Sequence, residues 1–460
     1  MNCNMPFTKL TIKNFKCFKA EQSVAFARPD SGLVGSGITY IVGANNSGKT
    51  TIIESLSIKK DSKIKSSNRT EGNDPEFKLF DENGLRRKCS LIRPESYTIE
   101  ENPSISGSDL FQIISSRRHW DSGAQQKHNS LGQSFGSSQA FENRNNAIAV
   151  GSELKFIESD SVKYAEFINL VQKVIPEFTK FAVGYEDHEF IEYISGANVR
   201  HKTELLGDGV ITVIRILLHL YTADNNPLII DEPELSLHPA AQKKLLKLIG
   251  EFSKNRQIIL STHSPYFINW EYLRNGATLN RVVKNEDKDS SVFSIRDFTK
   301  YDSLIKSANW QQPFLLDEVA KEILFMDDNI LFLEGQEDVG LLRKESLNED
   351  INIFGYGVRG KDNFRFALEL VKDLGYKKVC CILDNGASEN LIKSLLESQY
   401  KDIGYEIIQW NKNDIRDKAS YSTTEKTGYF TRDGNKKPSS DLDDFEGKIA
   451  DVNRYFKGVK

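Results

Sequence analysis

The sequence predicts an α/β protein with two domains, a larger one followed by a smaller one. Short apolar segments alternate with segments of helical periodicity over residues 152–268 and again over residues 329–409. This alternation is typical of mostly parallel sheets whose strands are connected by helices. A chain of 460 residues is also too long for one compact core, so at least two domains are expected.

The expected elements of the first domain begin with strands over residues 7–42, of which the last, at 38–42, leads into a glycine-rich loop and a helix. From residue 58 to about 151 apolar residues become sparse, which predicts a polar insertion with mobile loops. The pattern then returns in five elements: helix 162–174, helix 208–221, strand 227–231, helix 239–252 and strand 257–261.

The predicted boundaries are residues 1–300 for the first domain, 301–328 for a connector, 329–420 for the second domain and 421–460 for a polar tail of unclear fold. Within the second domain we expect strands at 329–333, 351–354, 378–383 and 405–409, and helices at 337–346, 362–374 and 388–398.

The composition is that of an ordinary soluble protein, with 39% hydrophobic and 27% charged residues. The net charge of −4 excludes a general polyanion binder, so contact with nucleic acid would need a local basic patch. The five cysteines have neither metal-ligand nor disulfide spacing. Because we also find no signal peptide and no apolar run of membrane-spanning length, we expect a cytoplasmic protein without a membrane partner.

A phosphate-binding loop is predicted at Gly43-Ala-Asn-Asn-Ser-Gly48-Lys49-Thr50, between a strand and a helix. Glycines let the backbone approach phosphate closely, and the helix N-terminus adds its dipole. Lys49 is expected to reach the β- and γ-phosphates, and Thr50 to ligate Mg²⁺. The residues predicted to bind ATP through this loop are Gly43, Asn45, Asn46, Ser47, Gly48, Lys49, Thr50 and Thr51.

A second half of the same site is predicted where an apolar strand ends in Asp231 and Glu232. Asp231 is expected to hold Mg²⁺ and Glu232 to polarise the attacking water. Glu234 could serve instead, although its place after a proline favours a helix start. His263 ends another apolar strand, so it either reaches the γ-phosphate or is a structural histidine.

The order of these three motifs resembles ABC-type ATPases of the RecF/SMC/OLD group, in which two heads sandwich ATP. The resemblance implies a homodimer or higher oligomer through the ATPase heads, with a signature segment that completes the partner's site. Gly207 and Gly209 match the position of that segment. Arg117 or Arg118 resembles an arginine near the phosphates in such heads, or is a solvated charge on the insertion.

A third candidate site lies in the second domain, where apolar strands end in Glu334 and Asp384, with Asp338 one helical turn after Glu334. Adjacent parallel strands would set these carboxylates side by side. Buried strands rarely end in convergent carboxylates without a cation, so we expect Mg²⁺ or Mn²⁺ there, suited to phosphodiester chemistry.

This second pattern resembles a TOPRIM domain, the metal-dependent module of topoisomerases, primases and OLD-family nucleases. Glu334 matches the TOPRIM glutamate and Asp384 the first residue of its Asp-x-Asp pair, whereas the second position is Gly386. Three alternatives follow from this departure: Asn385 or Glu389 replaces the missing second aspartate, the site binds one metal, or the site is inactive. The resemblance also implies a metal-site role for Asp338 and, for Lys418, a place near the scissile phosphate.

The two resemblances together identify an OLD-family protein, an ABC-type ATPase domain followed by a smaller TOPRIM-like domain. They imply an ATP-regulated, Mg²⁺- or Mn²⁺-dependent DNA endonuclease in bacterial antiphage defence, as in Gabija-type and retron-linked systems. DNA and an associated defence component, nucleic acid or protein, are the implied partners. Two alternatives remain: an ATPase scaffold whose degenerate TOPRIM-like domain holds a partner effector, and a RecF-like DNA-repair ATPase.

Overall fold

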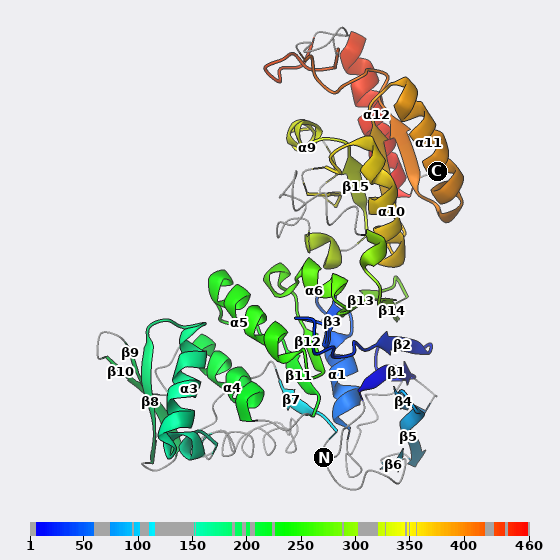
Figure 1. Cartoon of the computed structure of the whole chain (residues 1–460). Helices are drawn as coiled ribbons and strands as arrows, with labels where there is room; N and C mark the ends of the chain where they lie inside the picture. Colours follow the sequence, from blue (N-terminus) through cyan, green and yellow to red (C-terminus); the bar gives the residue numbers. More distant parts are fainter. Residues whose placement is uncertain are drawn as a thin grey trace, which may run out of the picture. The chain divides into compact units, whose positions relative to one another are not determined.

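The computed structural model describes residues 6–58, 74–93, 96–101, 110–115, 151, 153–185, 189–195, 199–202, 208–222, 226–287, 289–301, 321–326, 328–345, 347–348, 350–355, 357–418, 427–437 and 440–458. The chain divides into two compact units, Met1–Val292 and Phe293–Lys460 (Figure 1). In the described residues, no helix has the length and apolarity needed to cross a bilayer.

The first unit is built around a six-stranded sheet with the order β14-β13-β3-β12-β11-β7. β3 pairs in parallel with β12 and β13, and β11 pairs in parallel with β12 and β7. Its strands are β3 (Ile38–Val42), β7 (Gln112–Ile114), β11 (Leu228–Asp231), β12 (Ile258–Ser261), β13 (Thr278–Lys284) and β14 (Ser290–Ile295). Every residue of β3, β11 and β12 is buried, which explains why these strands are continuous apolar runs in the sequence.

An antiparallel sheet with the order β2-β1-β4-β5-β6 adds a second layer to this unit. Its strands are β1 (Phe7–Lys13), β2 (Gln22–Ala25), β4 (Glu76–Asp81), β5 (Gly84–Arg93) and β6 (Ser96–Glu101). The loops predicted for residues 58–151 are therefore interrupted by β4, β5, β6 and β7. In β4 only alternate residues are buried, among them Phe77 and Leu79 in the core shared with β1, so its polar face concealed the strand.

Helices flank the sheets of the first unit, and Figure 1 shows α5 running beside β11 and β12. They are α1 (Lys49–Ser57), α3 (Ser161–Gln172), α4 (Asp208–Thr222), α5 (Pro239–Phe252), the short η4 (Pro265–Phe267) and α6 (Trp270–Arg274). A small sheet, β10-β9-β8, is formed by β8 (Phe178–Tyr185), β9 (Glu189–Ser195) and β10 (Arg200–Lys202). The predicted helices 162–174, 208–221 and 239–252 are confirmed to within a few residues.

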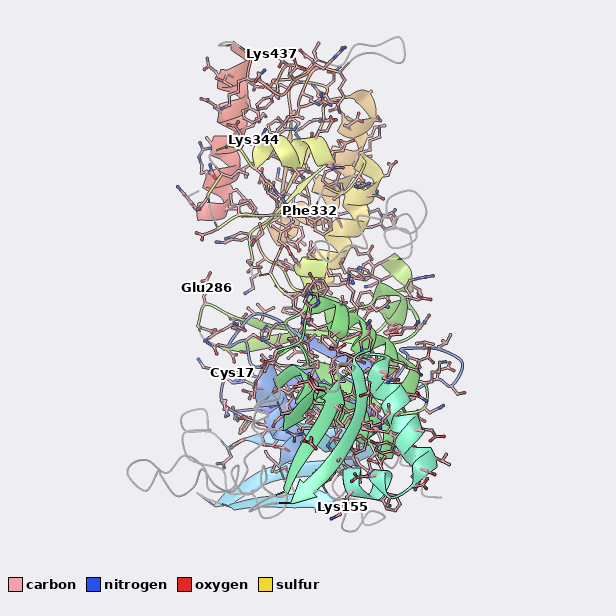
Figure 2. All side chains as sticks on the ribbon, turned by 90° about the vertical axis from the view of Figure 1, so that its left-hand side faces the viewer. Cys17, Lys155, Glu286, Phe332, Lys344 and Lys437 are labelled. Atoms are coloured by element: carbon pink, nitrogen blue, oxygen red, sulfur yellow. The ribbon has the colours of Figure 1, made fainter. Side chains whose placement is uncertain are left out.

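The second unit contains a parallel four-stranded sheet with the order β16-β15-β17-β18. Its strands are β15 (Ile330–Leu333), β16 (Asn352–Ile353), β17 (Val379–Leu383) and β18 (Glu406–Gln409). Its α-helices include α9 (Gln336–Leu342), α10 (Phe364–Asp373) and α11 (Ala387–Tyr400), and its 3₁₀ turns are η5 (Thr299–Tyr301), η7 (Glu322–Leu324), η8 (Lys361–Asn363) and η9 (Lys401–Ile403). Phe332 of β15, labelled in Figure 2, is fully buried. The alternation predicted for this domain is thus confirmed.

The residues after 420, predicted as a polar tail, include a helix of the second core. α12 (Ser440–Lys457) buries Phe445, Ile449, Val452 and Phe456 in the same cluster as Trp410. These four side chains recur at helical spacing, whereas most of the other positions are polar, so the average composition hid an amphipathic helix. The tail therefore contributes to the hydrophobic core of the second unit.

Candidate functional site

The glycine loop has a backbone that only small residues permit. Gly43 and Gly48 have φ of 145° and 119°. A Cβ at Gly43 would clash with the carbonyl of Val282 in β13, and one at Gly48 would lie 2.7 Å from Sγ of Cys17, which Figure 2 labels. Gly48 has no side chain with which to cap α1, so the N-terminus of that helix is suited to bind an anion.

Lys49 is buried and is held by its own loop. Its Nζ donates to the carbonyl oxygens of Gly43 (3.0 Å) and Ala44 (2.9 Å). Burial lowers the pKa of Lys49 to about 8, although the charges of Glu232 and Asp231 oppose that shift. Hydrogen bonds to neutral carbonyl oxygens are weaker than those to a charged phosphate. The ammonium group of Lys49 could therefore leave these carbonyls for a phosphate that enters the loop.

The other loop residues divide into exposed and buried positions. Asn45, Asn46 and Thr50 are exposed, whereas Ser47 and Thr51 are buried. Thr50 is an exposed residue that follows Lys49 directly, so its hydroxyl fits the role of a Mg²⁺ ligand. Thr51 lies instead 3.9 Å from Sγ of Cys17, a contact that supports packing of α1.

Asp231, Glu232 and His263 meet where β11 and β12 end. Asp231 pairs in register with Ser261, and the N–H of Glu232 donates to the carbonyl of Ser261 (2.9 Å). His263 Nε2 lies 3.4 Å from Oε1 of Glu232, and its Nδ1 lies 3.4 Å from Nζ of Lys49. The imidazole thus lies between Glu232, the predicted base, and Lys49, the lysine predicted to bind phosphate.

His263 is neutral at physiological pH. Burial and the charge of Lys49 lower its pKa to about 4, although Asp231 opposes the shift. The contact with Glu232 is consequently a polar contact and not an ion pair at pH 7, and the ring can donate one hydrogen bond and accept another.

Glu234, which the sequence offered as an alternative to Glu232, makes contacts that the sequence interpretation did not foresee. Its place after a proline favours a helix start, but α5 begins at Pro239. Its carboxylate accepts hydrogen bonds from the N–H of His263 (2.6 Å) and the hydroxyl of Thr262 (2.9 Å). Burial raises the pKa of Glu234, while the His263 amide opposes that shift.

Of the two glycines predicted for the signature segment, the structure describes Gly209. Gly207, like Arg117 and Arg118, lies outside the described residues. Gly209 is buried in the first turn of α4, where a Cβ would clash with the carbonyl of Ser236. The glycine at 209 is therefore required for packing between α4 and the loop that follows β11.

In the second unit, Glu334 and Asp384 come together as predicted. β15 and β17 are parallel neighbours, and the N–H of Asp384 lies 3.4 Å from Oε2 of Glu334. Beside them, a Cβ at Gly386 would clash with Oε2 of Glu389. The backbone of Gly386 is extended, so the carboxylate of Glu389, and not backbone strain, fills the space that an aspartate at 386 would need.

Lys361 is a residue that the sequence interpretation missed. Its Nζ donates to Oε1 of Glu389 (2.8 Å) and to the hydroxyl of Ser388 (2.7 Å). Burial raises the pKa of Glu389, but the hydrogen bonds from Lys361 and Ser388 bring it below its usual value. The hydrogen bond with Glu389 raises the pKa of Lys361, and the charge of Glu334 adds to this increase. An ammonium group thus lies among the carboxylates.

Asp338 and Lys418 belong to a neighbouring charged network. Oδ2 of Asp338 accepts the N–H of Gly335 (2.8 Å) at the start of α9. Burial, together with the charge of Asp414, raises the pKa of Asp338 to about 7, although the hydrogen bond from Gly335 and the charge of Lys418 oppose the shift. Lys418 pairs with Asp414 (2.7 Å) and Glu337 (3.0 Å), so it is engaged with carboxylates near Asp338.

The described residues contain no ready-made metal site. In the part of the chain that the structure describes, no three or more His, Cys, Asp or Glu side chains converge in an arrangement ready for a metal ion. The predicted set of Glu334, Asp338 and Asp384 therefore forms no ready three-ligand group. Glu334 and Asp384 remain a suitable hard-oxygen pair.

Comparisons with known proteins give one family and several distant relatives. An uncharacterized protein of Methanocaldococcus jannaschii is 26% identical over 155 residues, covering 34% of this chain and 18% of that protein. Endonuclease GajA of Bacillus cereus is 29% identical over 135 residues, covering 26% of this chain and 20% of that protein. The matched segments thus span about a fifth of each relative.

Among solved structures, the head domain of SMC from Thermotoga maritima has a TM-score of 0.38 and 17% identity, covering 64% of this chain and 100% of that chain. An SMC head from Pyrococcus furiosus, bound to the C-terminal domain of ScpA, has a TM-score of 0.42 and 17% identity, with coverage of 65% and 98%.

The family model described as AAA ATPase domain matches residues 5–115 and 95–268, which is more than half of the chain and contains the glycine loop, Asp231, Glu232 and His263. This protein therefore belongs to the AAA ATPase domain family.

Proposed function

We propose that this protein is an ABC-type ATPase whose second unit is a TOPRIM-like, Mg²⁺- or Mn²⁺-dependent DNA endonuclease, controlled by ATP. The observation that carries the nuclease half is the approach of Glu334 and Asp384 at the ends of two adjacent parallel strands, with 3.4 Å between the Asp384 amide and the Glu334 carboxylate. The name and 29% identity of the endonuclease GajA segment support the same reaction class.

In the ATPase half, each polar residue has a task that follows from its position. Lys49 would bind the terminal phosphates, and Thr50 and Asp231 would hold Mg²⁺, which neutralises charge on the nucleotide. Glu232 would accept a proton from the attacking water, and the neutral His263 beside it would orient the terminal phosphate. Gly207 and Gly209 would lie at the site of a second copy, so the assembly would be a homodimer or a higher oligomer.

In the nuclease half, Glu334 and Asp384 would hold the metal, which supplies Lewis acidity toward a phosphodiester. Glu389, which fills the space beside Gly386, would act in place of the absent second aspartate. Asp338 would support the same site as an additional acid. Lys418 would contact the scissile phosphate after leaving Asp414 and Glu337.

An alternative function is favoured by the contact between Lys361 and Glu389. An ammonium group already neutralises the carboxylate that would replace the missing aspartate, and no ready three-ligand group is present in the described residues. In this alternative the second unit binds a defence partner and cleaves nothing. ATP turnover by the first unit would then control release of that partner.

The deciding experiment is cleavage of plasmid and single-stranded DNA by the purified chain, with Mg²⁺ or Mn²⁺ and with or without ATP. Glu334→Gln and Asp384→Asn preserve shape and remove charge, so both should abolish cleavage while ATP hydrolysis continues. Glu397→Gln, on the same unit and paired with Lys393 on α11, is the matched control. A wild-type chain that hydrolyses ATP but leaves every DNA intact would support the scaffold alternative.

A further inference from the structure

The loop between β11 and α5 has an unusual backbone conformation. Glu232 and Ser236 have φ of 48° and 62°, in the left-handed region that residues with a Cβ rarely occupy. Two tight turns close the loop, because the N–H of Leu235 donates to the carbonyl of Glu232 and the N–H of Leu237 donates to that of Glu234. Since such strain persists only where surrounding contacts maintain it, those contacts show what the loop is coupled to.

The first contact joins the loop to His263. The carboxylate of Glu234 accepts the N–H of His263 at 2.6 Å and the hydroxyl of Thr262 at 2.9 Å. Thr262 is fully buried, so water does not compete for this hydroxyl. Glu234 therefore holds the backbone from which the His263 imidazole reaches Lys49 and Glu232.

The second contact joins the residues that follow β12 to Leu237, near the α5 end of the loop. The N–H of Ser264 donates to Oγ1 of Thr262 (3.0 Å), and the hydroxyl of Ser264 donates to Oε1 of Gln242 (2.6 Å). Nε2 of Gln242 in turn donates to the carbonyl of Leu237 (2.8 Å). Ser264 and Gln242 are both buried, so this chain of hydrogen bonds is shielded from solvent.

The third contact joins the loop to α4. The Cα of Gly209 lies against the carbonyl of Ser236, and a Cβ there would also lie 3.2 Å from Cδ2 of Leu237. Movement of Ser236 or Leu237 toward α4 would therefore press on the backbone of its first turn. No side chain at 209 could absorb such a movement, because glycine provides none.

We propose that Glu234, Thr262, Ser264 and Gln242 form a polar clip that positions His263 and transmits its position to the start of α4. The clip residues are positioning residues, since their hydrogen bonds join them to the backbone at His263 and to the loop between β11 and α5. The inference rests on the ATP-site role of His263 proposed above and is independent of the nuclease. Bound terminal phosphate changes what His263 contacts, and the clip carries that change to Gly209 through the strained loop.

The first test uses an isosteric pair at Thr262. Thr262→Val removes the hydroxyl and keeps the shape, whereas Thr262→Ser keeps the hydroxyl. We expect kcat for ATP to fall about tenfold or more in the valine variant and about threefold or less in the serine variant, with the ATP dissociation constant within about twofold of wild type in both. Glu251→Gln, on the surface of α5 and paired with Lys254, is the matched control.

Two outcomes of this test would overturn the clip. Wild-type turnover in Thr262→Val would show that the hydroxyl does not position His263. An equal loss of ATP affinity and kcat in Thr262→Val would show a general packing defect. If the wild-type chain itself failed to bind ATP, the proposed ATP site would fail together with the clip, and direct nucleotide binding separates that case from the other two.

The second test measures transmission by hydrogen exchange on the full chain with and without a non-hydrolysable ATP analogue. In the wild type, binding should change exchange in peptides over 209–222. In Gln242→Leu this change should fall by about half or more although the analogue still binds, whereas peptides over β13 should be the same in both proteins. An equal change at α4 in the two proteins would contradict the coupling.

Discussion

The two units place a lysine among carboxylates at the carboxyl edge of a parallel sheet, but they hold that lysine differently. In the first unit Lys49 donates to the neutral carbonyl oxygens of its own glycine loop. In the second unit Lys361 donates to the carboxylate of Glu389. The first arrangement leaves a cation ready for an incoming anion, whereas the second compensates charge internally. Under the proposed function, the same sheet geometry would produce a site prepared for phosphate in the first unit, and in the second unit a site that would have to exchange an ion pair before it could bind a metal.

The largest expected effect concerns Glu232, because its replacement should stop the proposed ATP hydrolysis by the first unit. Glu232→Gln should reduce ATP hydrolysis by about 10³-fold, because a proton acceptor for the attacking water is lost. ATP should remain bound and stabilise the dimer, which light scattering after size-exclusion chromatography measures. Unchanged turnover would remove Glu232 from its proposed role, and Glu251→Gln should resemble wild type.

The next effect concerns Lys49. Lys49→Ala should reduce ATP turnover by about 10²-fold, because a preorganised cation no longer stabilises the phosphates in the transition state. ATP affinity should fall as well, since the lysine contacts the ground state too. Steady-state kinetics and direct nucleotide binding measure both effects. Lys254→Ala, a surface change in the same unit, should alter neither, and full activity in Lys49→Ala would contradict the phosphate-binding assignment.

A pH series tests whether Lys49, which is paired with neutral carbonyl oxygens, binds the nucleotide through its charge. The pKa of Lys49 lies near 8, so its ammonium form is lost as the pH rises through 8, and about a tenth remains at pH 9. ATP affinity should therefore weaken about tenfold between pH 7 and pH 9. Lys49→Arg stays charged over this range and should show a much smaller decline. An equal decline in both proteins would assign the titration to another group.

The second unit offers the converse test. Lys361→Met removes the internal cation, so Mn²⁺ binding at Glu334 and Asp384 should tighten by about fivefold through loss of charge repulsion. Electron paramagnetic resonance of free Mn²⁺ measures this, with Glu334→Gln as the baseline that lacks the site. Lys393→Met on α11 is the matched surface control. Weaker Mn²⁺ binding in Lys361→Met would show that the lysine supports the site.

The smallest effect concerns stability. The pKa of Asp338 is raised from its usual 3.8 to about 7, so the folded state favours the neutral form. The stabilisation by this group is complete below about pH 4 and is lost as the pH rises through 7. Asp338→Asn keeps an acceptor for the Gly335 amide and should raise the unfolding free energy at pH 8 by about 1 kcal/mol, with little effect at pH 4. Urea titrations at both values measure this, and an equal change at both would contradict the shift.

Most elements around the sites were predictable from the sequence because buried parallel strands are continuous apolar runs. β3, β11, β12, β15 and β17 all have this form, and each was expected within a few residues. β4 and α12 were missed because each has one polar face, which lowers the average hydrophobicity of a short window. Their apolar residues recur at spacings of two and of three to four, so periodicity carried a signal that composition concealed.

By itself the sequence determined the chemistry present at the strand ends: the glycine loop with Lys49, the pair Asp231 and Glu232, and the acids Glu334 and Asp384. These follow from local order, because a strand end and the residue after it are adjacent in the chain. Only the tertiary structure decided how they are paired. Glu234 meets His263 and Lys361 meets Glu389 across 29 and 28 positions, and such contacts depend on the parallel packing of separate βα units, which no local pattern encodes.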